Sequence, residues 1–99
     1  MRAKKFVQKR ITNEIPLEKI IKGFANEIRL EIMFLLEKRP HLSVENISEA
    51  LEVEYKNLSA HLYKLSMGGI IGKKYQGKSV LHSLTNRGKV ILTFVRMIE

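Results

Sequence analysis

A pair of consecutive glycines, Gly68-Gly69, separates two kinds of pattern in this chain of 99 residues. Before the pair, apolar residues recur every three or four positions, which is the spacing of amphipathic helices. After it, two short segments flank a second glycine turn, as in a β-hairpin, and helical spacing then returns. Glycine accepts the left-handed backbone that often ends a helix. The pattern predicts a mainly α-helical α+β fold with a small hairpin between helices.

Start and stop signals divide the helical parts into five segments. Pro16 is expected in the first turn of the first helix, and Pro40 ends the second. Asn26, Ser43 and Thr85 suit the N-caps of the second, third and last helices, because their short side chains accept hydrogen bonds from free backbone N–H groups. The expected helices cover about residues 16–23, 27–38, 44–51, 54 or 55–67, and 86–98.

Segment 70–84 is expected to form two strands joined at Gln76-Gly77-Lys78. In the second strand Val80, His82 and Leu84 share one face, so this face should pack on the helices, with His82 as a packing residue. The short connection between the third and fourth helices makes a helix-turn-helix geometry possible. We therefore expect one domain over residues 15–99, preceded by a basic N-terminal arm at 1–14.

Composition excludes several classes of function. The chain has no cysteine, which removes disulfides, thiolate metal sites and cysteine nucleophiles. No apolar run is long enough for a membrane span, and the basic start is not followed by a signal-peptide pattern, so a cytoplasmic protein is expected. The formal charge of +8 favours a polyanionic partner, and nucleic acid is the commonest one.

The charge is segregated along the chain. Residues 1–10 carry five basic residues and no acid, residues 11–54 five basic and nine acidic residues, and residues 55–99 eight basic residues and one acid. The net charges of these segments are +5, −4 and +7, which sum to +8. A charge that served only solubility would be spread along the chain. The arm and the C-terminal half are therefore expected to form a basic surface that binds a polyanion.

The fourth helix is the main candidate for DNA contacts. Leu58, Leu62 and Leu65 account for its buried side, and no acid follows Glu54 on this helix. An ordinary solvent-facing helix mixes Glu with Lys, whereas a surface that faces phosphates excludes carboxylates. The side chains expected to face bases are Tyr55, Lys56, Asn57 and Ala60, and those expected to position the helix on the backbone are Ser59, His61 and Lys64. His61 is equally compatible with a structural, half-buried position.

The predicted hairpin carries a second basic group, made of Lys73, Lys74, Gln76 and Lys78 around a glycine turn. Lysines at strand edges also discourage sheet-to-sheet association, so this group alone has an ordinary structural explanation. Its place about ten residues after a groove-entering helix favours contacts with the flanking minor groove or its phosphates.

Three runs resemble the winged helix-turn-helix of the ArsR family of transcription regulators, with the MarR group as a near relative. They are IRLEIMFLLEKR, LSVENISEALEVEYKNLSAHLYKL and GGIIGKKYQGKSVLHSLTNRGK. The matching positions include Arg29 with Leu30 and Ile32, the SxHL of Ser59 to Leu62, Leu65, the exit Gly69-Ile70-Ile71, and the LTxxG of Leu84 to Gly88. The resemblance covers about residues 15–98.

The resemblance implies a wing of two or three strands and a symmetric dimer joined through the first and last helices, with recognition helices in successive major grooves. The wide apolar stripe of the last helix independently favours such a partner. Many relatives sense metals through cysteines on the recognition helix or through Asp, His and Glu on the last helix. Neither ligand set is present here, so no metal or other cofactor is expected.

Three other functions can be compared with that of a transcription regulator. An enzyme is not expected, because the few acids and histidines are scattered and no glycine-rich phosphate loop occurs. A nonspecific architectural DNA-binding protein would use the same lysines without reading bases. A winged helix adapted to protein contacts would be indicated by acids on the recognition helix, which are missing.

Overall fold

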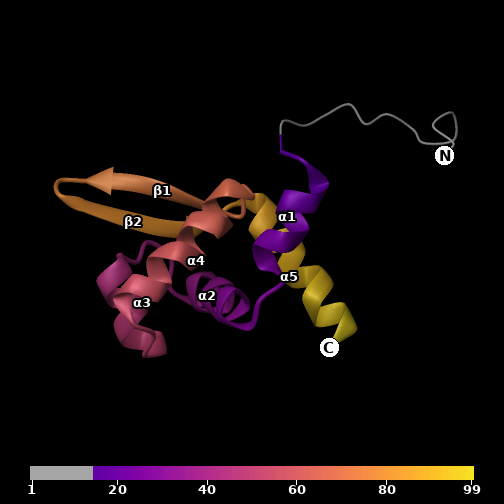
Figure 1. Ribbon diagram of the computed structural model, residues 1–99, viewed down its shortest axis with the longest axis horizontal. Coiled ribbons are helices and arrows are strands. Elements are labelled where there is room, and N and C mark those ends of the chain that lie inside the picture. The colour runs from indigo at the N-terminus through magenta and orange to yellow at the C-terminus, as the bar shows by residue number, and fades with distance from the viewer. Residues whose placement is uncertain (1–14) are drawn as a thin grey trace, which may run out of the picture.

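The computed structural model describes residues 15–99, which form five helices and one antiparallel pair of strands (Figure 1). The predicted mainly α-helical fold with a hairpin is therefore confirmed. The predicted basic arm, residues 1–14, lies outside the described residues. The elements in chain order are α1 (Leu17–Phe24), α2 (Glu27–Lys38), α3 (Val44–Leu51), α4 (Tyr55–Met67), β1 (Ile71–Gln76), β2 (Ser79–Leu84) and α5 (Asn86–Ile98).

Three helices begin at the predicted caps. The side chain of Asn26 accepts a hydrogen bond from the Arg29 N–H at 3.1 Å, and that of Ser43 accepts one from the Asn46 N–H at 3.1 Å. Thr85 likewise accepts a hydrogen bond from the Gly88 N–H at 3.2 Å. Each cap satisfies a backbone donor that has no partner within its helix, which explains why these boundaries were predictable.

The boundaries of α1 and of the hairpin turn differ from the prediction by one residue. Pro16 is the N-cap of α1 and not part of its first turn, because its backbone is extended at φ −60° and ψ 142°, and the helix continues to Phe24. The hairpin turn consists of Gly77 and Lys78 alone, since Gln76 still pairs with Ser79. Gly77 has a φ of +62°, the left-handed backbone that a tight hairpin turn requires.

The core lies between the helices and the inner face of the hairpin. It combines Ile32, Met33 and Leu36 of α2 with residues of α3, α4, β1 and α5 that are also buried. His82 is 2% exposed, and its Nδ1 lies 3.0 Å from the Leu42 carbonyl oxygen, so its predicted packing role is confirmed. Leu42 and His82 also form a single antiparallel bridge, which adds one residue of a third strand to the two-stranded sheet.

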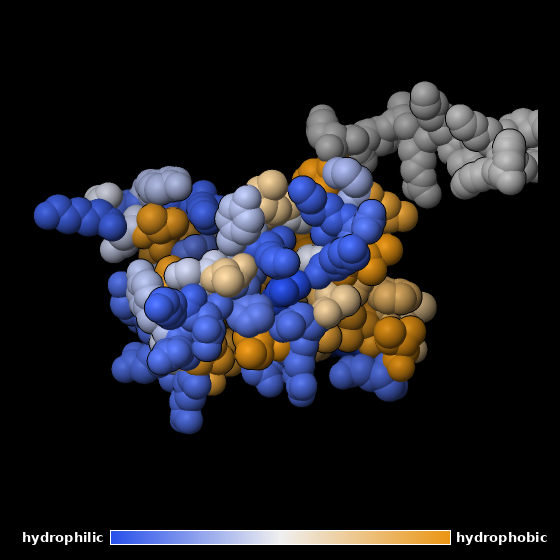
Figure 2. All heavy atoms as spheres, viewed as in Figure 1, coloured by the Kyte–Doolittle hydropathy of each residue, from blue (hydrophilic) through white to orange (hydrophobic). Residues whose placement is uncertain are grey.

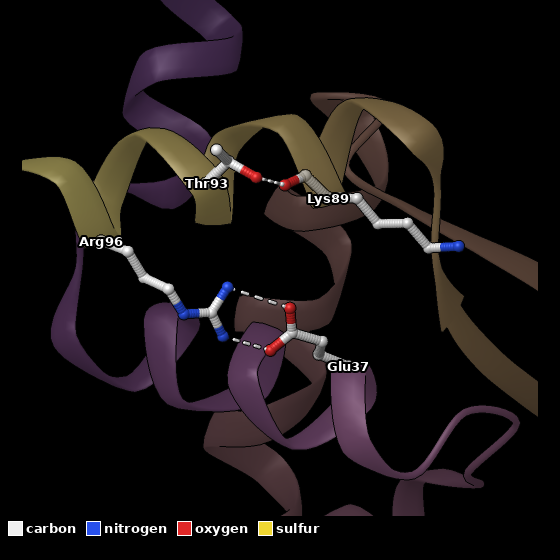
Figure 3. A network of polar contacts seen from close by, with 4 residues as sticks. All are labelled: Glu37, Lys89, Thr93 and Arg96. Carbon is white, nitrogen blue, oxygen red and sulfur yellow. Dashed lines mark hydrogen bonds and ion pairs between the residues drawn. The ribbon is translucent and has the colours of Figure 1, made fainter.

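A polar contact joins α5 to α2 (Figure 3). Arg96 donates two hydrogen bonds to the carboxylate of Glu37, one of them from Nη1 at 3.1 Å. The guanidinium also lies over the Phe34 ring, 5.4 Å from its centroid. The hydrogen bonds from Arg96 hold the pKa of the Glu37 carboxyl below its usual value.

Among residues 15–99, no helix has the length and apolar character needed to cross a membrane.

Candidate nucleic-acid interface

Helix α4 is held in place by its apolar side and by the turn that precedes it. Leu58, Leu62 and Leu65 are all buried, at 0%, 3% and 0% exposure, as their spacing predicted. In the turn, the Ser48 hydroxyl donates to the Val53 carbonyl oxygen at 2.7 Å, which ties the end of α3 to the approach to α4. The opposite side of α4 must therefore face outward.

Six of the seven predicted contact residues on α4 lie on this outer side. Ser59 uses its hydroxyl on its own helix, donating to the Tyr55 carbonyl oxygen at 3.3 Å, and keeps its oxygen lone pairs available. No side chain from position 55 to 67 is acidic, and Glu54 stands at the N-cap. The six exposed residues are Tyr55, Lys56, Asn57, Ser59, Ala60 and Lys64.

His61 differs from the other six because it is half-buried and its side chain bonds a side chain of another helix. Its Nδ1 accepts a hydrogen bond from Arg29 Nε of α2 at 3.1 Å. Arg29 Nη1 also donates to the Lys22 carbonyl oxygen at the end of α1, at 2.8 Å. Burial, followed by the charges of Arg29 and Lys64, lowers the pKa of His61, which favours the neutral imidazole that can accept this bond.

Arg29 was not among the predicted site residues, although it is joined to α4 in the structure. The residue was noted only as part of the ArsR pattern, and its partner His61 lies 32 positions away. A basic residue near the start of a helix, together with a histidine beside a leucine stripe, was the available signal. It did not specify that the two side chains meet.

The four predicted wing residues are brought together at the hairpin. Lys73, Lys74 and Gln76 are exposed on β1, and Lys78 is exposed in the turn. Tyr75, which was not predicted as a contact, is 73% exposed on the same strand. Antiparallel pairing, such as Lys74 with Leu81, extends β1 and β2 to Gln76 and Ser79 at the tip, so the lysine-bearing part of the hairpin is accessible.

The two basic elements lie toward one end of the molecule. In Figure 1 the hairpin and the α3–α4 pair extend toward the same end, whereas α1 and α5 lie at the other. Figure 2 shows hydrophilic side chains at the hairpin tip and hydrophobic ones gathered at the α1 and α5 end. The described residues 15–99 include no group of three His, Asp or Glu side chains that could hold a metal ion.

Comparison with known proteins identifies the family. The family model described as "Bacterial regulatory protein, arsR family" matches residues 26–73, from the N-cap of α2 into β1. The structure of HlyU from Vibrio cholerae is 30% identical in sequence, has a TM-score of 0.68, and the match covers 81% of this chain and 88% of HlyU. The chain belongs to the ArsR family.

Other solved structures have the same fold. The transcriptional repressor PagR of Bacillus anthracis is 28% identical, with a TM-score of 0.67 and coverage of 77% of this chain and 90% of PagR. A homodimeric winged helix-turn-helix DNA-binding domain from Mycobacterium bovis is 24% identical, with a TM-score of 0.75 and coverage of 83% and 76%. The predicted winged helix fold is thereby confirmed. No curated protein sequence matches the chain.

Proposed function

We propose that this ArsR-family protein regulates transcription as a homodimer that binds specific sequences of double-stranded DNA. Helix α4 enters the major groove with Tyr55, Lys56, Asn57 and Ala60 toward the bases. Ser59, His61 and Lys64 position the helix on the backbone, and the wing residues Lys73, Lys74, Gln76 and Lys78 hold the flanking backbone. Residues 2–10 of the basic arm add contacts to phosphates or to the minor groove.

The observation that carries this proposal is the outer side of α4, where exposed basic and amide side chains occur without a carboxylate from Tyr55 to Met67. A carboxylate close to phosphates would be repelled, and the repulsion grows as water is excluded from the interface. Asn57 lies in the first turn, where a groove-entering helix approaches base edges, and its amide can form two hydrogen bonds with adenine. Lys56 and Lys64 supply positive charge on either side of it.

The proposed dimer is supported by apolar side chains that the monomer leaves exposed on α1 and α5. Phe94 is 50% exposed and Met97 is 78% exposed, although both belong to a helix whose other side is packed in the core. Large apolar groups in one region of a surface are typical of protein interfaces. The exposed set on these helices is Leu17, Ile21, Val90, Phe94, Met97 and Ile98. A two-fold dimer would bind a palindromic site with half-sites about 34 Å apart.

Selection of duplexes from a random DNA library, followed by titration at several salt concentrations, tests the proposal. We expect the selected duplexes to be palindromic and to bind at least about 1000-fold more tightly than random duplexes of the same length. Affinity should fall with salt, by a logarithmic slope of about 0.9 for each phosphate contacted. Equal affinity and equal salt slope for both kinds of duplex would favour the architectural alternative and contradict specific regulation.

Two exposed helical lysines provide a matched pair of variants. Lys64→Glu, on α4, should abolish detectable binding or lower affinity strongly, whereas Lys89→Glu, on α5, should have a much smaller effect. Asn57→Ala should relax base preference at one position of the half-site, with a loss of about 1 to 3 kcal/mol for the selected duplex. Retention of specific binding after simultaneous change of Lys56, Asn57 and Lys64 to glutamate would rule out α4 as the recognition helix.

A further inference from the structure

A groove of about 390 Å³ lies between α1 and the C-terminal half of α4. Its volume is within the range of about 300 to 1,000 Å³ that is usual for small-molecule sites. Of the predicted DNA-contact residues, only Lys64 lines this groove. Its lining includes Lys19, Lys22 and Gly23 from the α1 side and Tyr63, Lys64 and Met67 from α4.

A close approach of the two helices forms the floor of the groove. Gly23 is buried where α1 meets α4, and a side-chain carbon there would lie 3.3 Å from the Lys64 carbonyl oxygen and 3.1 Å from Ile70 Cδ1. Tyr63 and Met67 contribute apolar surface on the α4 side, although they are 60% and 41% exposed. Apolar groups of this size, left open to water beside a groove, favour a ligand that has an apolar body.

The charged groups around the groove favour an anion. Glu18 and Lys22 form an ion pair at 2.8 Å, and this pair contributes no net charge. Lys19 and Lys64 also line the groove, and neither forms an ion pair within residues 15–99. The groove therefore carries a net charge of about +2 from its lining. Segment 1–10 of this chain, which carries five basic residues and no acid, has the wrong charge to complement it.

We propose that this groove binds a small organic anion with an apolar body, of the size of a one- or two-ring aromatic carboxylate. The carboxylate interacts with the ammonium groups of Lys19 and Lys64, and the ring packs against Tyr63 and Met67. Binding to the groove is independent of the function proposed above. Its regulatory consequence rests on that function: the anion engages Lys64 and adds negative charge to α4, so it lowers the affinity of the protein for DNA.

Titration of the isotope-labelled full chain with 2-naphthoate, followed by NMR, tests the site, with uncharged 2-naphthamide as the matched ligand. We expect saturable shifts centred on the lining residues and binding of the amide that is weaker by about 10-fold. Lys19→Gln should weaken naphthoate binding about three-fold, and Lys89→Gln on α5 should leave it unchanged. Equal binding of naphthoate and naphthamide, or shifts centred on Val90 and Phe94 of α5, would overturn the proposal.

The regulatory consequence is separated from the proposed function by measuring DNA affinity with and without ligand. Binding of selected DNA in the absence of naphthoate tests the function alone. Saturating naphthoate should then weaken that binding about three-fold or more, and the effect should shrink in Lys19→Gln. If naphthoate occupies the groove while DNA affinity stays constant, the regulatory role is refuted. A different outcome would overturn the site: the protein does not bind naphthoate, and Lys19→Gln weakens DNA binding in the absence of ligand. Lys19 would then be a contact to the duplex and not to an anion in the groove.

Discussion

Arg29 joins three helices, so its replacement by methionine should loosen the position of α4. The guanidinium donates to the Lys22 carbonyl oxygen at 2.8 Å and to His61 Nδ1 at 3.1 Å. A third, longer contact reaches the Gly23 carbonyl oxygen at 3.5 Å. Methionine keeps an unbranched apolar stem of similar reach but removes all three hydrogen bonds and the positive charge.

The expected cost follows from where these bonds lie. The bond to Lys22 is exposed and the bond to His61 is partly buried. Hydrogen bonds from charged donors contribute about 1.5 to 3 kcal/mol when protected from water, and exposed ones contribute less. We therefore expect Arg29→Met to lower the free energy of unfolding by about 2 kcal/mol. For a domain of this size, the melting temperature would fall by about 8 to 15 °C.

A double-mutant cycle with His61→Leu isolates the bond between the two side chains. Urea unfolding, followed by circular dichroism at one fixed protein concentration, should give a coupling energy of about 1 kcal/mol between the two changes. Lys89→Met, at an exposed lysine of α5, serves as the control and should change stability by less than about 0.5 kcal/mol. Additivity of the two single changes within about 0.3 kcal/mol would refute the idea that Arg29 positions α4 through His61.

Three further predictions concern packing, pH and assembly. Gly88→Ala should lower the free energy of unfolding in urea by about 1 to 3 kcal/mol, because the new carbon would lie 2.5 Å from the Ile70 carbonyl oxygen. Gly72→Ala serves as the control and should cost far less, because the atom nearest to its new carbon lies 3.7 Å away. Burial lowers the pKa of His82 below 6.5, so the unfolded chain binds more protons there, and the free energy of unfolding should decrease as pH is lowered through about 6.5. This pH dependence, measured from urea midpoints, should become shallower in His82→Gln. Phe94→Glu should shift sedimentation from dimer to monomer, because the ring is 50% exposed in the monomer and a carboxylate would have to be desolvated in the interface.

The helix boundaries were predictable where a local signal determines them. Asn26, Ser43 and Thr85 each cap a helix by a bond to a backbone N–H three residues later, so the signal and its effect lie within one turn. The start of α1 was less predictable. Proline is compatible with both the N-cap and the first turn, and the extended backbone of Pro16 selects the former.

The outer side of α4 was predictable for a different reason. Once the leucine stripe from Leu58 to Leu65 is buried, helical geometry directs the intervening residues outward, and this outcome needs no knowledge of the partner elements. The position of His61 was not predictable in the same way. It lies at the edge of the stripe, where its exposure depends on whether another helix supplies a group to meet it.

Features that depend on two helices meeting were the ones that sequence reasoning missed. The Arg29–His61 bond and the groove beside Lys64 both depend on how α1 and α2 lie against α4, and residue spacing within a helix does not contain that information. Gly23 permits the close approach of α1 to α4, yet in the sequence it was indistinguishable from a glycine that merely ends a helix. In the proposed function, base contacts lie on the part of α4 that periodicity reveals, whereas control of those contacts lies where helices meet.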